Sequence, residues 1–285
     1  MQAVVSHGDA SSPAELYWET KLPNTPMPKP IQDFLPEAVP LGRGAKLFHE
    51  SGGMLKSRTF LYKNAATPEE IAASNSDIFF YEDQLKPGNK LRVRFSTTSR
   101  HVKFLPAKLT DTLPLSSKDL PQTLARLAIT PTSAAAKEMS DTVEDCEAPK
   151  AYGDNDEKCV ASLEEMIDFS IEKLGQHIQI MPSSVERNDK AVQEYTIEEL
   201  GVRRFAGDRT VACHAKSFAY PTFICHASST TRAYIVPLLG ADGNKVTSLV
   251  ACHADTVKWN PDNLAFKLLK EKPGNVTVCH FLPDR

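Results

Sequence analysis

Four Cys-His dipeptides in the last quarter of this chain could together bind a transition metal. They are separated by ten, twenty-five and twenty-five residues and comprise Cys213-His214, Cys225-His226, Cys252-His253 and Cys279-His280. Each follows a short run of residues typical of β-strands, and successive side chains of a strand point to opposite faces. If the strands are neighbours, one face gathers four sulfurs at disulfide distance and the other gathers four imidazoles. The spacing therefore predicts an imidazole metal site backed by disulfides.

Two alternatives stay open at this point. A structural zinc knot also uses cysteine and histidine, but such knots space their ligands two to four residues apart. The chain contains no C-x-x-C or H-x-x-H motif. In the other alternative the cysteines are structural and the histidines only accompany them at the surface. Fourfold repetition of the same dipeptide favours the metal site.

The composition limits the class of protein. With 285 residues, 41% of them hydrophobic, the chain can bury one large core or two small ones. A net charge of −3 argues against nucleic acid or an anionic membrane as the main partner, because both select a basic surface. No apolar run is long enough to span a membrane, and the first seven residues lack the apolar core of a signal peptide.

Cysteine usage indicates an oxidising compartment. Six cysteines fit three disulfides, with Cys146 and Cys159 as a local pair and the other four as two more. Asn275-Val276-Thr277 is a glycosylation sequon and agrees with secretion.

The elements that must position the dipeptides follow from periodicity and turn residues. Residues 1–66 are expected to form an extended N-terminal arm, because the run from Leu22 to Pro30 contains four prolines. A capping box at Thr67-Pro68-Glu69-Glu70 then opens a short helix, so the folded domain is expected to cover residues 67–285.

Strands are expected before and after a helical middle. The first two are 78–81 and 91–96, joined by a turn at Pro87-Gly88. Helices are expected at 120–127, at 134–143, and from Leu163 to Gly175 after a second capping box at 162–165. His177, just beyond, is interpreted as structural. Further strands are expected at 177–181, 194–197, the four Cys-His runs, 232–239 and 264–270, with a hairpin turn at 241–244. This order predicts an α+β fold in which a helical middle precedes an antiparallel sheet stapled by disulfides.

The spacing CH-x10-CH-x25-CH-x25-CH resembles the signature of the plant BURP-domain proteins. Several flanking segments are also similar to that family: Tyr17-Trp18, Leu22 to Pro28, Phe79-Phe80, Leu85 to Gly88, Phe104 to Pro106, Ser162 to Glu164, Thr230 to Tyr234, Gly240 to Gly243, Trp259 to Pro261 and Phe281 to Pro283. The resemblance covers most of the chain.

The resemblance implies a disulfide-stapled BURP-domain fold in the secretory pathway, extracellular or vacuolar. It also implies copper, with two ions favoured, held by the histidines of the dipeptides. Some members are copper-dependent oxidative macrocyclases of ribosomally synthesised peptides, which use dioxygen to crosslink a Trp or Tyr side chain of a core peptide. On this resemblance the metal ligands and catalytic residues are His214, His226, His253 and His280. The staples are Cys213, Cys225, Cys252 and Cys279, for which three connectivities exist.

Two departures from the family pattern bear on function. Many members carry histidine where Asn263 stands, so no metal role is carried over to that position. Self-processing cyclases also contain a core peptide upstream of the domain, and the candidate in this chain is Gly52 to Tyr62. The core peptide is therefore expected either in this chain or in another. The alternative function is that of a non-catalytic secreted protein of cell wall or seed.

Overall fold

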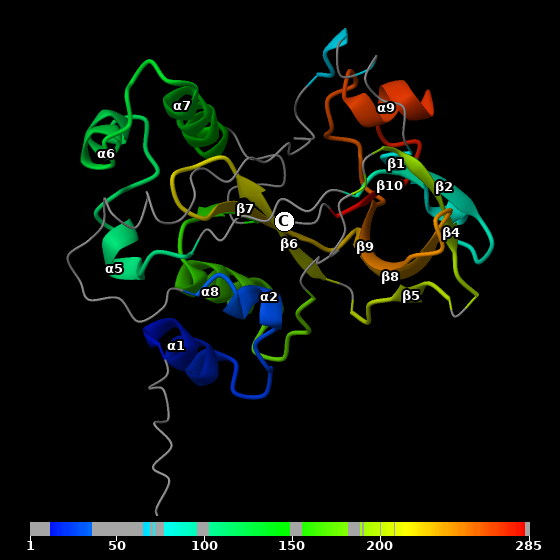
Figure 1. Cartoon of the computed structure of the whole chain (residues 1–285), viewed down its shortest axis with the longest axis horizontal. Coiled ribbons are helices and arrows are strands. Elements are labelled where there is room, and N and C mark those ends of the chain that lie inside the picture. Colours follow the sequence, from blue (N-terminus) through cyan, green and yellow to red (C-terminus); the bar gives the residue numbers. More distant parts are fainter. Residues whose placement is uncertain are drawn as a thin grey trace, which may run out of the picture.

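The computed structural model describes residues 12–35, 65–68, 71, 77–95, 103–148, 156–181, 189, 191–199, 201–207 and 209–282. It combines helices with two antiparallel sheets, which confirms the α+β class (Figure 1). The helices are α1 (Pro13–Lys21), α2 (Lys29–Gln32), the 3₁₀ helix η1 (Glu82–Gln84), α5 (Ala107–Thr110), α6 (Leu120–Arg126), α7 (Ala134–Glu147), α8 (Leu163–Leu174) and α9 (Leu264–Leu269). The strands are β1 (Phe79–Tyr81), β2 (Lys90–Val93), β3 (Glu157–Val160), β4 (Gln193–Ile197), β5 (Arg203–Arg204), β6 (Thr210–Lys216), β7 (Thr222–Ser228), β8 (Thr231–Gly240), β9 (Lys245–His253) and β10 (Val278–Phe281).

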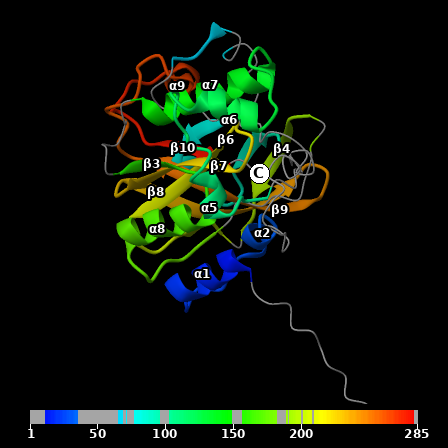
Figure 2. The ribbon, with the colours of Figure 1, turned by 90° about the vertical axis from the view of Figure 1, so that its left-hand side faces the viewer.

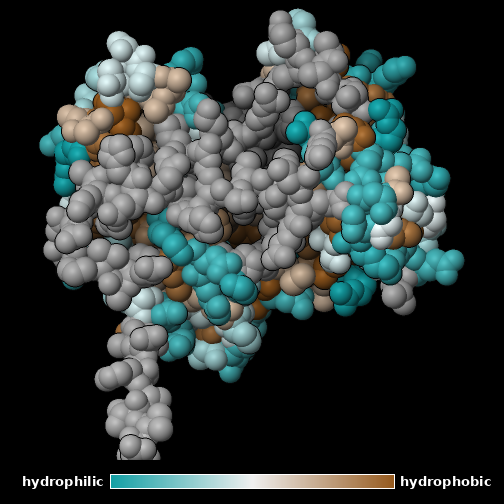
Figure 3. All heavy atoms as spheres, viewed as in Figure 1, coloured by the Kyte–Doolittle hydropathy of each residue, from teal (hydrophilic) through white to brown (hydrophobic). Residues whose placement is uncertain are grey.

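The larger sheet curls around its own apolar core. Its strand order is β1-β10-β9-β8-β4-β2, and β5 pairs with β8. Although β1 and β2 lie at opposite ends of this order, the backbone N–H of Asp77 donates to the carbonyl of Arg92 at 2.7 Å. The interior contains Phe80, Leu91, Val93, Tyr195, Val236, Leu238 and Val250. In Figure 3 the described surface over β2, β4 and β5 is mostly hydrophilic, as expected for the outer face of such a sheet.

The smaller sheet has the order β3-β7-β6 and is covered by helices. α8 packs Met166 and Phe169 against the Cys225 side of this sheet. Ser162 caps α8 by accepting from the N–H of Glu165, and Gly175, with φ +84°, ends it. The expected capping box is only half formed, because the carboxylate of Glu165 accepts from the N–H of Ala161. Figure 2 shows α1 lying beside α8.

The hairpin between β8 and β9 has the predicted turn. The N–H of Gly240 donates to the carbonyl of Asn244 at 2.8 Å, and Gly243 has φ +82°, which favours glycine. The resulting register places Thr231 directly opposite His253. The hairpin therefore fixes one side of the predicted metal site.

The prediction of an extended N-terminal arm is wrong for residues 12–35, which contain α1 and α2. α1 begins with a capping box between Ser12 and Glu15, and Trp18 is 3% exposed. The Trp18 indole donates to the carbonyl of Thr25 at 2.7 Å, and its ring lies in a core cluster with Leu163 of α8. Of the run from Leu22 to Pro30, which was predicted to be free of helix, residues 22–28 are free of helix but Lys29 and Pro30 begin α2. The domain boundary at residue 66 stays a prediction, and the candidate core 52–62 lies outside the described residues.

We expect Trp18→Ala to destabilise the whole protein, because it removes a buried indole from the interface between α1 and α8. The free energy of unfolding should fall by about 3–5 kcal/mol, as for other buried tryptophans. Urea unfolding followed by circular dichroism measures this. Leu16→Ala is the matched control in the same helix, since Leu16 is 53% exposed and should change stability by at most about 0.5 kcal/mol. Equal effects of the two substitutions would contradict the packing.

Two local predictions are corrected. The run 264–270 forms α9 instead of a strand, because Asn263 caps it by accepting from the N–H of Ala265, while Leu264 and Phe266 are buried. So short an apolar run carries no decisive periodicity. Residues 177–181 form no strand. The two expected strands before the helical middle are present as β1 and β2, which pair with β10 and β4. Of the predicted helix at 67–70, the described part is one turn, in which the N–H of Ile71 donates to the carbonyl of Thr67.

Within the described part of the chain, no helix combines the length and the apolar character that crossing a membrane requires.

Candidate metal site of paired imidazoles

The disulfides join cysteines that face each other across neighbouring strands. Cys213 pairs with Cys225 between β6 and β7, and the Cα atoms are 4.0 Å apart. Cys252 pairs in the same way with Cys279 between β9 and β10, also at 4.0 Å. The expected local disulfide, Cys146–Cys159, links α7 to β3. Because all six cysteines are oxidised, none can serve as a thiolate ligand, and the zinc-knot alternative is wrong.

The same register brings the histidines together on the other face. Each follows its cysteine by one residue, so two histidines on antiparallel strands lie diagonally across from each other, within reach of long side chains. The Nε2 atoms of His214 and His226 are 3.1 Å apart, and those of His253 and His280 are 3.3 Å apart. The ring planes are nearly parallel, with an interplanar angle of 10° between His214 and His226 and of 6° between His253 and His280. The prediction that cysteine and histidine leave on opposite faces is confirmed.

The two pairs belong to different sheets and meet between them. His214 and His226 come from the smaller sheet, whereas His253 and His280 come from the larger one. The four Cys-His strands are therefore not all neighbours in one sheet, which was the condition for gathering all four imidazoles on a single face. The ring centroids of His226 and His253 are nevertheless 6.3 Å apart, so all four imidazoles form a chain of neighbouring rings. The turn between β7 and β8 connects the sheets at this place.

Aromatic rings pack against the His253–His280 pair in the larger sheet. Trp259 lies edge-to-face on His253 with ring centroids 5.3 Å apart, and Phe79 contacts His280 in the same manner at 6.0 Å. Trp259 and Phe79 share a core cluster with α9. His226 and His253 are buried, while His214 and His280 are half-buried. Each pair thus has one inner and one outer imidazole.

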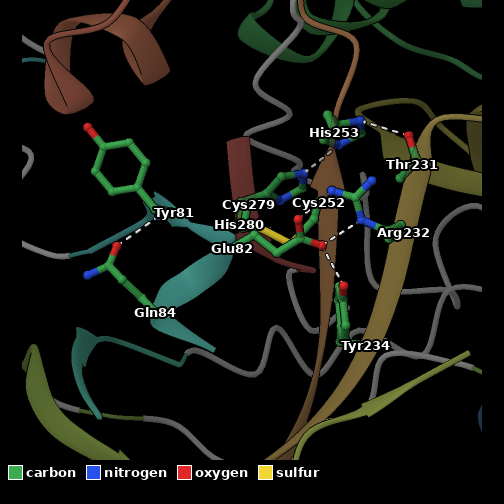
Figure 4. Close-up of a disulfide and its surroundings, with 10 residues drawn as sticks. All are labelled: Tyr81, Glu82, Gln84, Thr231, Arg232, Tyr234, Cys252, His253, Cys279 and His280. Atoms are coloured by element: carbon green, nitrogen blue, oxygen red, sulfur yellow. Dashed lines mark hydrogen bonds and ion pairs between the residues drawn. A yellow bond between two sulfur atoms is a disulfide. The ribbon is translucent and has the colours of Figure 1, made fainter. Parts of the chain in front are cut away.

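The Nδ1 atoms of the second pair have defined partners, and Figure 4 draws Thr231 beside His253. Nδ1 of His280 lies 3.0 Å from the carbonyl oxygen of Phe281. A carbonyl only accepts, so this nitrogen donates its N–H and the neutral ring keeps its lone pair on Nε2. Nδ1 of His253 lies 3.0 Å from the hydroxyl of Thr231. The Nε2 lone pair of His280 therefore faces its neighbour, where a metal ion would bind it.

A charged cluster occupies the opposite, disulfide side of the larger sheet. The carboxylate of Glu82 accepts from Arg232 Nε at 2.6 Å and from the Tyr234 hydroxyl at 2.5 Å (Figure 4). The hydrogen bond from Arg232 lowers the pKa of Glu82, and burial raises the pKa of Tyr234. Arg232 is the cross-strand partner of Cys252. The cluster thus ties the end of β1 to β8 and takes no part in the imidazole face.

Burial lowers the pKa of three of the four imidazoles and so favours their neutral form. It lowers the pKa of His226 to about 4, and the nearby His280 ring acts in the same direction. Burial also lowers the pKa of His253 well below its usual value, followed by the effects of His280, His226 and His214. For His280, burial lowers the pKa although the hydrogen bond to Phe281 opposes the shift. Neutral imidazole is the form that binds metal.

We expect the metal-free protein to lose stability between about pH 6.5 and pH 4. Unfolded histidine protonates near pH 6.5, whereas folded His226 stays neutral to about pH 4, so below 6.5 the unfolded state binds more protons. At pH 5 His226 alone then costs about 2 kcal/mol of stability. Urea unfolding at pH 7.5 and pH 5 in a chelator measures the loss. His226→Gln should lose this part of the dependence and His177→Ala, at an exposed position, should keep it. Equal stability at both pH values contradicts the burial argument.

The donor set fits a first-row transition metal. Two imidazole nitrogens 3.1 or 3.3 Å apart could both ligate one first-row ion, since such ions take nitrogen ligands at about 2.0–2.1 Å. Among the residues that the structure describes, no group of three or more His, Cys, Asp or Glu side chains is placed to hold a single ion. Each pair therefore offers two protein nitrogens and leaves other coordination positions to further ligands.

The sequence does not identify the residues that surround the imidazoles. Thr231, Trp259 and Phe79 stand in it only as parts of segments that resemble the family pattern. The strand register that places Thr231 opposite His253 follows from the predicted turn at 241–244. No local signal announces Trp259 or Phe79, because α9 and β1 reach the site through tertiary packing.

A profile of the BURP domain matches residues 78–285 of the chain. This chain belongs to the BURP-domain family. All four Cys-His dipeptides lie within the matched BURP domain, whereas α1 and α2 precede it.

Curated relatives support the same family. BURP domain-containing protein 3 of Oryza sativa subsp. japonica is 43% identical over 231 residues, which cover 79% of this chain and 53% of the relative. BURP domain protein RD22 of Arabidopsis thaliana is 37% identical over 230 residues, 79% of this chain and 58% of the relative. BURP domain-containing protein 5 of Oryza sativa subsp. japonica is 37% identical over 284 residues, 96% of this chain and 86% of the relative. The chain thus spans little more than half the length of the first two relatives.

Proposed function

We propose that this BURP-domain chain is a copper-dependent oxidative macrocyclase of ribosomally synthesised peptides, which crosslinks a Trp or Tyr side chain of a core peptide. The observation that carries the proposal is the pairing of imidazoles, with Nε2 atoms 3.1 and 3.3 Å apart in two adjacent pairs. Two pairs agree with two copper ions. His214, His226, His253 and His280 are the proposed ligands and catalytic residues.

The chain's own residues hold and shield the reacting centre. Copper bound there supplies one-electron oxidation and a binding position for dioxygen. His226 and His253 are the buried imidazoles of the two pairs. The Trp259 and Phe79 rings exclude water from the pair in the larger sheet. Overall the peptide loses two hydrogens as one bond forms, and dioxygen takes up two electrons and two protons to give hydrogen peroxide. Ligation to two nitrogens per pair leaves room for substrate.

The core peptide is supplied in cis or in trans. In cis, the candidate Gly52 to Tyr62 ends four residues before Ala66. The N–H of Ala66 donates to the carbonyl of Asp262 at 2.7 Å, and its side chain packs on the cluster that contains Trp259. Ala66, which follows the candidate in sequence, thus lies beside the cluster that contains Trp259, and this supports a test of cyclisation in cis.

The test is oxidative turnover with copper. The full chain is loaded with Cu(II), supplied with dioxygen, and examined by intact-mass and fragment mass spectrometry, alone and with a peptide containing a Trp or Tyr core. Loss of two hydrogens from the chain supports cyclisation in cis, and loss from the added peptide supports it in trans. Zinc-loaded protein is the control, because zinc has no redox chemistry.

The rival function is that of a non-catalytic secreted BURP protein of cell wall or seed, with an interaction or structural role. The names of the relatives from Oryza sativa and Arabidopsis thaliana given above state the BURP domain and no enzymatic activity. Stoichiometric copper binding without any loss of hydrogens, in cis or in trans, favours this rival over the cyclase.

We also place the protein in the secretory pathway, extracellular or vacuolar. Three disulfides fit an oxidising compartment, and Asn275 of the glycosylation sequon is exposed.

A further inference from the structure

The turn that joins the two sheets contains a short chain of hydroxyl groups. Ser228 is the last residue of β7, and Thr231 is the first residue of β8. The Ser228 hydroxyl oxygen accepts from the N–H groups of Thr230 and Thr231 at 3.1 and 3.0 Å. The Thr231 hydroxyl donates to the same oxygen at 2.9 Å. Thr231 is buried, so its hydroxyl has a fixed orientation.

This orientation determines which nitrogen of His253 carries the proton. Since the Thr231 hydroxyl donates to Ser228, its lone pairs face Nδ1 of His253 at 3.0 Å. Nδ1 must then donate its N–H, and the neutral ring keeps its lone pair on Nε2. The carbonyl of Phe281 imposes the same tautomer on His280.

Both Nε2 lone pairs consequently point at each other across 3.3 Å. Two lone pairs at this distance repel unless a cation lies between them. A protein that fixes both tautomers in this way is prepared for a metal ion. Removing one of the Nδ1 partners would instead let His253 place its proton on Nε2 and donate it to His280, which blocks both lone pairs.

We propose that Thr231, oriented by Ser228, is the positioning residue that selects the metal-binding tautomer of His253. The inference rests on the proposed metal binding at the His253–His280 pair. It assigns the turn between the sheets a role in metal affinity, although neither hydroxyl is a ligand. Partners of this kind typically contribute about 10- to 100-fold to metal affinity.

The experiment compares Thr231→Val with Thr231→Ser. Valine keeps the shape of the side chain but can neither accept nor donate, whereas serine keeps the hydroxyl and loses the methyl group. We expect Thr231→Val to weaken Cu(II) binding at this pair about 10- to 100-fold in competition with a chelator. Thr231→Ser should retain most of the affinity. A role in packing alone predicts the reverse order, because serine would then be the more damaging change.

A second readout does not need metal. In the metal-free protein, ¹⁵N NMR of the histidine rings should show His253 protonated on Nδ1, and Thr231→Val should move the proton to Nε2. Thr247→Val is the control, since Thr247 is an exposed threonine of β9, the strand that carries His253. Unchanged tautomer and unchanged affinity in Thr231→Val would overturn the inference. Absence of copper binding in the unmodified protein would refute the proposed function, while the NMR comparison would still decide the role of Thr231.

Discussion

His214→Ala and His280→Ala will each abolish copper binding at one imidazole pair and leave the other pair occupied. Each substitution removes one of the two nitrogens that face each other at 3.1 or 3.3 Å. Even partners of a metal ligand contribute about 10- to 100-fold to affinity, so loss of a ligand should weaken binding by at least about 100-fold. The unmodified chain is expected to hold two copper equivalents and each variant one. Cyclisation should be lost in both, because the proposed reaction needs the complete centre.

These two positions are chosen because both imidazoles are half-buried, which limits the damage to folding. Metal content after gel filtration and thermal unfolding of the metal-free variants measure occupancy and fold separately. His177→Ala is the matched control, since His177 is described, exposed and outside the cluster. It should keep both equivalents. If either single variant lost all copper, the four nitrogens would share one ion, and the assignment of one ion to each pair would be wrong.

The sequence alone was sufficient to predict that each histidine leaves its strand on the face opposite its cysteine. Alternation of side chains along a strand requires that Cys213 and His214 face opposite ways, and the structure confirms this for both strand pairs. The α+β order and the 241–244 turn followed from similarly local rules. Such predictions hold because the period of a strand and the positive φ of a turn glycine depend on neighbours in sequence.

Local sequence rules do not predict which strands pair with each other. Nothing near Cys225 specifies Cys213 as its partner over Cys252 or Cys279, and only the order of strands in two separate sheets decides it. The packing of α1 is likewise tertiary, because Trp18 is buried by side chains of α8 more than a hundred residues away. α9 shows the same limit at a smaller scale, since a short run of apolar residues is compatible with either a buried helix or a buried strand.

The curled shape of the larger sheet explains why the imidazole cluster is built from both sheets. The pair His253 and His280 lies on a sheet whose interior is already filled by its own apolar core, so the imidazoles must face another element. The smaller sheet supplies that element together with His226, whose ring is 6.3 Å from His253. Shifts in how the sheets meet would therefore change the distance between the two imidazole pairs, while the disulfides would keep each pair intact.

This separation of roles leads to the second large effect. The double substitution Cys252→Ala and Cys279→Ala should remove metal binding from the pair in the larger sheet. The disulfide closes a loop with a sequence separation of 27 residues, and its loss should cost about 3–4 kcal/mol of stability by the loop-entropy estimate. More importantly, it frees β10, a four-residue strand, to shift against β9. A shift by one residue would turn His280 to the opposite face.

The matched control is the double substitution Cys146→Ala and Cys159→Ala. It removes a disulfide with a sequence separation of 13 residues, which joins α7 to β3 and does not link two strands that carry histidines. The loop-entropy estimate for it is about 3 kcal/mol, so the two double variants should be similarly destabilised. Their copper contents should differ, with one equivalent lost from the first and none from the second. Substitution is preferable to chemical reduction, because thiol reductants themselves bind copper. Equal copper loss in both variants would show that the disulfides act through general stability, and the register argument would then fail.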